Sequence, residues 1–439
     1  MAGGGAAQTS EGIDRVLSEN PLSGLQWRTI ILCGIVAMLD GFDTQSVAFV
    51  APVLAEAWGL TPDKIGLIFA GGLLGIMVGQ IVLGPLADRF GRRPVIIACT
   101  AAFGVCSLAT VIADGWISLL FLRFITGVGL GGATPNIIAL TAEMSPPARR
   151  ASIVTTMFAG FPLGAALGGY ISSHIIPAYG WQSVFILGGI LPLVTLLFLF
   201  PMLRESPHYL ANNRPGSEIL SRIMKTIAGR EVELPASDLI TGSGPSAGYA
   251  ALFQGGLGRT TLLLWFAYLN SLLMIYFLMN WLPSTAKASG LNLDTAIVSA
   301  VFLNLGGAIG GIILGALGDR FGAFKVLIPG YIIAGFSIGG VGMFAGEAVA
   351  LMVLVFVAGL FTIGGQTAMN AAAASLYSAK VRATGLGAAL AAGRIGSIAG
   401  PALGGVLLAQ KWDLQLVFLC AAAPAFAVAA TVAVLAKKR

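Results

Sequence analysis

Long apolar runs alternate with short polar intervals along almost the whole chain. A run of about 20 apolar residues is long enough to cross the hydrocarbon core of a bilayer as a helix. Twelve such runs occur, near residues 30–54, 65–86, 94–113, 117–141, 153–176, 182–201, 261–283, 295–317, 325–345, 349–372, 384–408 and 414–436. The pattern predicts an all-α polytopic membrane protein with twelve transmembrane helices.

The composition agrees with this prediction. Hydrophobic residues make up 56% of the 439 residues and charged residues only 10%, a balance that a water-soluble globule cannot hide in its core. The polar N-terminus has no charged leader followed by an apolar core, so we expect no cleaved signal peptide. All four cysteines fall in predicted spans, which argues against a disulfide framework or a metal site.

Basic residues indicate the orientation in the membrane. Twenty lysines and arginines fall in the segments on the side of both termini, against only Lys64, Lys287 and Lys411 on the other side. Because basic loops stay in the cytoplasm, both termini are expected there. The net charge of +6 therefore reflects topology and contact with membrane lipid, and no nucleic-acid partner is expected.

Two sequence motifs occur twice. The segment "GPLADRFGRR" from Gly84 returns as "GALGDRFGAFK" from Gly315, 231 residues later, and "PPARRA" ending at Ala151 returns as "AKVRATG" around Ala383. The repeat predicts two pseudo-symmetric six-helix halves. The expected division is an N-terminal segment 1–27, a first half 28–201, a cytoplasmic linker 202–258, a second half 259–436 and a tail 437–439.

The repeated loops suggest a gate at the cytoplasmic face. Asp88 is expected to accept hydrogen bonds from a neighbouring helix N-terminus, while the nearby arginines face the cytoplasm. These loops either only anchor the topology or also form a conformational latch. The candidate gate residues are Gly84, Asp88, Arg89, Gly91, Arg92, Glu143, Asp319 and Arg320.

On these motifs the sequence resembles the major facilitator superfamily. "GPLADRFGRR" matches its loop signature, "RFITGVGLGG" from Arg123 its fourth-helix pattern, and "RESPHYL" its signature after helix 6, from which Arg204 departs. Within the superfamily, "DGFD", "NWLP" and "GRIGS" resemble the aromatic acid/proton symporters. The resemblance spans nearly the whole chain and implies a transporter without a cofactor.

Four charged residues lie inside the predicted spans and away from their ends: Asp40, Asp43, Arg123 and Arg394. Each ionised side chain at the bilayer centre costs roughly 2.5–3.5 kcal/mol on insertion scales. The repeat-related positions hold the uncharged residues Ser271, Met274, Val355 and Leu163. The architecture is built twice but each of these charges only once, which favours a function over the alternative of a structural ion pair.

Depth along the helices suggests a role for each charge. Asp40 and Arg394 each lie twelve residues from a cytoplasmic arginine, roughly 18 Å into the membrane. Arg394 is predicted to bind a substrate carboxylate, and Asp40, Asp43 and Arg123 to couple protons, with Arg123 at the level of Asp43. Asp40 is also a substrate-site candidate, together with Thr44, Phe161, Tyr276, Trp281, Asn304 and Gln366, although helix packing is the preferred explanation for the aromatic residues.

The predicted function is proton-coupled import of a small aromatic carboxylate by alternating access in a bacterial inner membrane. The protein is expected to work as a monomer, with no cofactor or metal. The alternatives are a carrier for another solute, such as an aliphatic organic anion, a sugar or a drug, and a transporter-like sensor. An intramembrane aspartyl protease is disfavoured because Asp40 and Asp43 share one helix.

Overall fold

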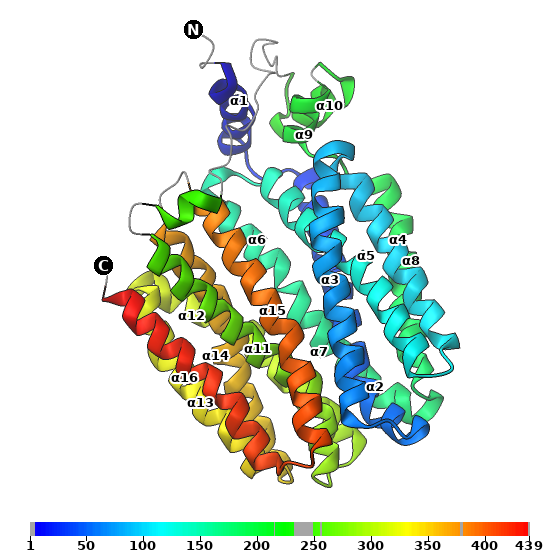
Figure 1. Ribbon diagram of the computed structural model, residues 1–439. Coiled ribbons are helices and arrows are strands. Elements are labelled where there is room, and N and C mark those ends of the chain that lie inside the picture. The colour runs from blue at the N-terminus through cyan, green and yellow to red at the C-terminus, as the bar shows by residue number, and fades with distance from the viewer. Residues whose placement is uncertain (1–4, 215, 232–248, 255–256, 378–380, 438–439) are drawn as a thin grey trace.

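The computed structural model describes residues 5–214, 216–231, 249–254, 257–377 and 381–437. Twelve helices in this part of the chain are long and apolar enough to span a membrane, and the described residues contain no β-strand. The prediction of twelve membrane-spanning helices is therefore confirmed. Figure 1 shows the helices as one bundle, with both termini at the same end.

The first six spans extend a few residues beyond the predicted ones at most ends. The first helix begins at Gly24, inside the segment predicted to precede it, because Ser23 and Gln26 form a capping box. The spans are α2 (Gly24–Trp58), α3 (Pro62–Phe90), α4 (Arg92–Ala109) with the 3₁₀ turn η1 (Thr110–Ile112), α5 (Trp116–Glu143), the η2–α6–α7 segment, and α8 (Gln182–Met202).

The fifth span differs from the prediction of one continuous helix. It consists of the 3₁₀ turn η2 (Pro147–Arg149), α6 (Arg150–Phe158) and α7 (Gly160–Tyr179). Pro162 lacks the N–H that would bond to the Phe158 carbonyl, and its ring crowds that carbonyl. The interruption after Phe158 follows from this proline.

The last six spans lie close to their predicted positions. They are α11 (Gly258–Ala288), α12 (Leu293–Phe321), α13 (Ala323–Met343), α14 (Ala348–Leu376), α15 (Arg382–Ala409) and α16 (Leu414–Ala436). The last of these helices ends at Ala436, as predicted.

The connection between the halves was predicted only as a polar interval, yet it contains α9 (Pro207–Asn213), α10 (Glu218–Ala228) and the 3₁₀ turn η4 (Tyr249–Phe253). In α10 the apolar side chains recur at helical spacing. They pack with α9 and with α1 (Gly5–Glu19) in a small separate core, which includes Ile13, Leu17, Leu210, Leu220, Ile223, Met224 and Ile227. Figure 1 shows these three helices beyond one end of the bundle.

Glycines allow the same helix pairs to approach closely in both halves. A Cβ atom on Gly127 of α5 would collide with the Gly72 carbonyl oxygen of α3. A Cβ atom on Gly359 of α14, 232 positions after Gly127, would collide with the Leu303 carbonyl oxygen of α12. Small residues at such contacts are typical of packed membrane helices. The internal repeat therefore includes the helix interfaces as well as the loops.

The two halves meet at the end of the bundle that lies away from α1, α9 and α10. A Cβ atom on Gly66, near the start of α3, would lie 2.9 Å from the Pro401 carbonyl oxygen of α15. At the same end, Lys287 Nζ lies 2.6 Å from Glu56 Oε1. Figure 1 shows α3 and α15 approaching each other toward this end.

Candidate transport site

Asp40 lies near the middle of α2 and is almost fully buried. Its carboxylate accepts a hydrogen bond from Thr44 Oγ1 at 3.1 Å and contacts Thr134 Oγ1 of α5 at 2.6 Å. The Thr134 hydroxyl also lies 3.0 Å from the Leu130 carbonyl oxygen. Since a hydroxyl has one proton to donate, it can donate to the ionised Asp40, or donate to Leu130 and accept from a protonated Asp40. The contact suits both protonation states.

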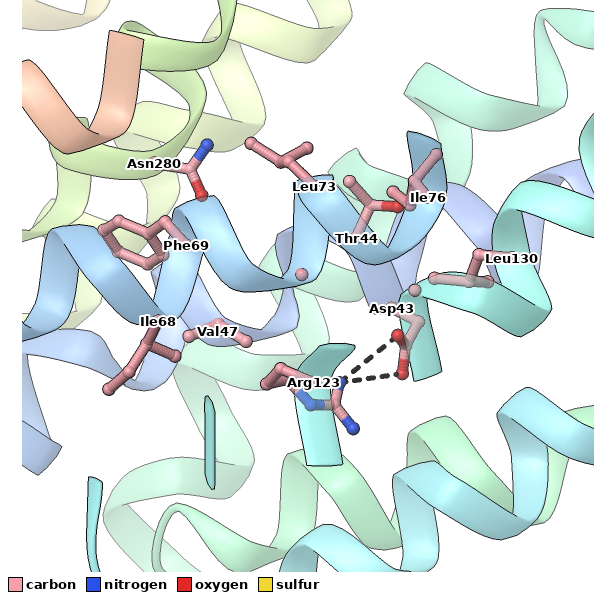
Figure 2. A pocket seen from close by; sticks show the side chains of 12 residues that line it. Asp43, Thr44, Val47, Ile68, Phe69, Leu73, Ile76, Arg123, Leu130 and Asn280 are labelled. Carbon is pink, nitrogen blue, oxygen red and sulfur yellow. Dashed lines mark hydrogen bonds and ion pairs between the residues drawn. The ribbon is translucent and has the colours of Figure 1, made fainter. Parts of the chain in front are cut away.

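Asp43 and Arg123 form a buried ion pair, as Figure 2 shows. Arg123 Nη1 lies 3.3 Å from Asp43 Oδ2, and both side chains are at most 3% exposed. Ser107 of α4 donates to Asp43 Oδ1 at 2.9 Å, and the Arg123 guanidinium lies 4.8 Å from the centre of the Phe185 ring. Arg123 thus lies beside Asp43, at the level expected from the sequence.

Further partners hold Arg123 in place. Its Nη2 donates to Thr110 Oγ1 at 2.5 Å and to Thr126 Oγ1 at 3.1 Å. Its Nε is buried without a hydrogen-bond partner among the described residues. A charge pair so deeply removed from water is stable only when most of its polar atoms are satisfied, and the hydroxyls of Ser107, Thr110 and Thr126 contribute to that here.

A small cavity of about 30 Å³ lies next to this ion pair. Figure 2 shows that Thr44 and Leu73 line it from the first half and Asn280 of α11 from the second half. This volume has room for a water molecule and none for an aromatic ring. In this conformation the cavity beside the Asp43–Arg123 pair is too small to hold an aromatic acid.

Arg394 lies on α15 and is half-buried. Its Nε donates to Gln80 Oε1 of α3 at 3.1 Å, and its Nη1 donates to the Tyr276 hydroxyl of α11 at 3.3 Å. A guanidinium has five N–H groups, so three remain after these two bonds. Within the described part of the chain, no carboxylate forms an ion pair with Arg394. This arginine is therefore positioned by neutral groups and keeps the capacity to bind an anion.

The remaining substrate candidates differ in their surroundings. Ser271 donates to Gln366 Oε1 at 2.6 Å, in a polar cluster that also includes Tyr331 and Asn370. Asn304 is fully buried, and its amide group donates to Gln45 Oε1 at 2.7 Å. Asn304 therefore connects the two halves in this structure.

The three aromatic candidates also differ in their surroundings. Phe161 is partly buried and stacks on Phe158 at 5.8 Å between ring centres. Trp281 is only 1% exposed, and its indole N–H donates to the Pro401 carbonyl oxygen at 2.8 Å. Trp281 therefore packs between helices, the alternative considered for these aromatic residues, and only Tyr276 contacts Arg394.

The gate residues of the first half form a network in which Glu205, instead of Asp88, caps a helix. Arg92 bridges Asp88 Oδ1 at 2.6 Å and Glu143 Oε1 at 3.3 Å. The N-terminus of α4 donates its backbone N–H groups at Arg92 and Arg93 to Glu205. The expected helix-capping role of Asp88 is wrong for this conformation, because its side chain is 73% exposed and Glu205 already occupies the N-terminus.

The remaining gate residues are two glycines, two arginines and Asp319. Gly91 ends α3 at a φ of 105° with Glu205 against it, so a Cβ atom there would be both strained and blocked. Gly84 lies in α3 opposite Pro135, and Arg89 is exposed over the Phe90 ring. In the second copy Arg320 lies over Phe321, whereas the side chain of Asp319 is outside the described part of the structure.

Comparison with known proteins decides the family. The model of the Major Facilitator Superfamily matches residues 33–312 and 264–439. The chain belongs to this superfamily. It is 37% identical to the 4-hydroxybenzoate transporter PcaK of Pseudomonas aeruginosa, over 97% of this chain and 95% of that protein. It is also 37% identical to the gallate transporter of Pseudomonas putida, over 94% of this chain and 92% of that protein.

Solved structures agree on the major facilitator fold. The Escherichia coli xylose transporter XylE, in a partially occluded inward open conformation, matches with a TM-score of 0.70 over 93% of this chain and 97% of that one. At 17% identity the likeness concerns the fold alone. Family membership makes the chain a multi-pass membrane transporter, and not an enzyme.

The sequence did not lead us to predict several polar residues of the candidate transport site. Gln80 and Thr134 contact the central charges, and Ser107 contacts Asp43. Each was visible as a polar side chain inside a predicted span, which was the available signal. Glu205 stood inside the recognised "RESPHYL" segment, but its contact with α4 depends on residues more than 100 positions away.

Proposed function

We propose that the protein imports a small aromatic carboxylate together with protons, by alternating access between its two halves. The single observation that carries this proposal is Arg394, which neutral partners hold in position and no described carboxylate neutralises. The names of the relatives, transporters of 4-hydroxybenzoate and gallate, supply the substrate class. Both of these compounds are aromatic acids.

In this proposal Arg394 binds the substrate carboxylate with two parallel hydrogen bonds. The Tyr276 hydroxyl, already bonded to Arg394, lies next to the bound acid. Phe161, Gln366 and Asn304 remain candidates for contacts with the ring and its hydroxyls, while the packing of Trp281 makes it part of the scaffold.

The two aspartates take different parts in coupling. Asp40 carries the proton, because its contact with Thr134 suits both its charged and its neutral form. Asp43 stays paired with Arg123 and communicates with the small cavity beside it. Moving more protons than substrate charges lets the membrane potential drive import, at about 2.3 kcal/mol per net charge per 100 mV.

The proposed location is the bacterial inner membrane, with both termini in the cytoplasm and a single chain as the working unit. This orientation follows from the basic residues at the end of the bundle that carries the termini. With this orientation the contacts of Gly66 and of the Glu56–Lys287 pair close the periplasmic side.

A test of this function starts with ligand screening. We expect benzoate, hydroxybenzoates, dihydroxybenzoates, phenylacetate or phthalates to raise the thermal unfolding temperature of the purified protein. Sugars and aliphatic acids are the controls. Stabilisation by these compounds alone would contradict the proposal that the substrate is an aromatic acid. Counterflow of the stabilising acid in proteoliposomes then separates a carrier from a sensor, because a sensor binds without exchange.

A further inference from the structure

A groove of about 540 Å³ opens on the outer surface of the bundle between α2 and α8, apart from the transport site. It is lined mainly by apolar side chains. Arg28 is the one charged residue of the groove, whose lining also includes Trp27, Ile31, Ile35, Phe198 and Met202.

The position of the groove fits a lipid chain. Gly24 begins α2 and Met202 ends α8, so the groove starts at the membrane boundary on the side of the termini. Eleven residues separate Gly24 from Ile35, which corresponds to about 16 Å along the helix axis. Trp27, Ile31 and Phe198 are each more than half exposed and face the bilayer. A groove of this length and apolarity suits hydrocarbon.

Arg28 adds a charge that the described residues do not neutralise. Its Nε atom is buried without a hydrogen-bond partner. No carboxylate of the described chain forms an ion pair with it. A guanidinium that lines an apolar groove without a counter-ion favours the binding of an anion beside it.

We propose that this groove binds one phospholipid with a singly charged anionic headgroup, of the phosphatidylglycerol type. The phosphate binds the guanidinium of Arg28, and an acyl chain lies along the side chains of α2 and α8. Basic sites between membrane helices on the cytoplasmic side suit anionic headgroups in this way. The competing explanation is that Arg28 only reaches interfacial water, as arginines near helix ends do.

The internal repeat provides a matched control. Arg259 stands 231 positions after Arg28, the offset of the repeated loops, and is the second residue of α11. Its side chain is exposed, whereas that of Arg28 is partly buried. Substitution of either residue by glutamine removes one positive charge, so a difference between the two variants reports on the groove and not on net charge.

The test is native mass spectrometry of protein extracted from vesicles of equal phosphatidylglycerol and phosphatidylcholine. We expect the wild type to retain the anionic lipid preferentially, and Arg28→Gln to reduce that preference by about fivefold, the effect of one basic residue near an anionic surface. Arg259→Gln should keep the preference of the wild type for the anionic lipid. Equal retention of both lipids by the wild type, or equal losses in the two variants, would overturn the proposal.

A second variant tests the groove itself. Gly24 lines the mouth, and a Cβ atom there would meet nothing within 4 Å. Gly24→Phe should therefore place its ring in open space and lower retention of the bound lipid without unfolding the protein. Unchanged lipid retention in a folded Gly24→Phe variant would place the lipid elsewhere and contradict the assignment.

Discussion

At the residue scale, the site separates charges with permanent partners from those that remain available. Arg123 is enclosed by Asp43, Thr110, Thr126 and the Phe185 ring. Arg394 instead keeps free N–H groups between two halves of the molecule. This difference is the reason for assigning the substrate carboxylate to Arg394.

Arg394→Lys tests this assignment. Lysine keeps the positive charge but lacks the planar fork that holds a carboxylate with two bonds. We expect affinity for the aromatic acid to fall about tenfold or more, since a hydrogen bond to a charged group contributes roughly 1.5–3 kcal/mol. Binding is measured by titration calorimetry on purified protein. A lysine variant that binds like the wild type would exclude the bidentate contact.

Arg123→Gln should be strongly destabilising, because it leaves Asp43 charged and buried without its partner. Breaking a buried pair from one side costs about 3–5 kcal/mol. The double variant Asp43→Asn with Arg123→Gln should recover much of the loss of thermal stability. Additive losses in the double variant would mean that the two side chains do not interact as the ion pair implies.

How much of the site the sequence predicts depends on the kind of residue. The four membrane charges stand out because ionised groups are rare in lipid. Thr134 does not stand out, because its hydroxyl bonds to the Leu130 carbonyl oxygen of the same helix, as threonines in membrane-spanning helices commonly do. Gln80 is recognised only through Arg394, 314 positions away, and no local pattern encodes that distance.

At the element scale, the number and order of the spans follow from hydropathy, while their junctions depend on contacts. The helices after α8 were missed because α10 buries only one narrow face, against α1 and α9. The junction between α3 and α4 also depends on a contact with a distant residue. Its tight turn at Gly91 is completed by Glu205, which lies after α8 and satisfies the first N–H groups of α4.

Glu205 predicts a pH dependence of stability. Burial raises the pKa of this carboxyl above its ordinary value, although hydrogen bonds from the backbone of Ser206, Arg93 and Arg92 oppose the shift. The folded state therefore binds this proton more tightly than the unfolded state. Its contribution to stability is fully present below the ordinary glutamate pKa of about 4.3 and is lost as pH rises through the raised value.

Glu205→Gln should weaken the dependence of thermal stability on pH across this range. The measurement is the thermal unfolding temperature across that pH range, with Glu347→Gln as the control, since Glu347 is exposed and forms no ion pair with another described residue. The wild type and the control should both lose stability with rising pH, while Glu205→Gln should lose less. Parallel profiles for all three proteins would remove Glu205 as the cause.

At the scale of the whole molecule, the two halves contact each other closely at the end that lies away from α1, α9 and α10. Glu56–Lys287 and the contact of Gly66 with α15 hold that end together. At the other end Asp88 is exposed and bonds to Arg92 of its own half. Alternating access requires these contacts to exchange, so the gate of the first half must find partners in the second half.

Asp88→Asn should therefore slow transport far more than it weakens substrate binding. The exposed carboxylate is available to stabilise the state in which the two halves close at this end, and the amide carries no charge to do so. Initial uptake rates in proteoliposomes and affinities in detergent are compared for the two proteins. Equal losses of rate and affinity would place Asp88 in binding instead of in state exchange.

The central claim is that Asp40 carries the coupled proton. Asparagine at position 40 imitates the neutral form permanently, so Asp40→Asn should lose accumulation driven by a proton gradient. It should still exchange labelled for unlabelled acid, because exchange does not require the proton to leave.

The decisive measurement compares proton-driven accumulation and counterflow of the same aromatic acid in the same proteoliposomes. The account predicts that Asp40→Asn vesicles show counterflow without accumulation, while wild-type vesicles show both. Normal accumulation by Asp40→Asn vesicles under a proton gradient would contradict it.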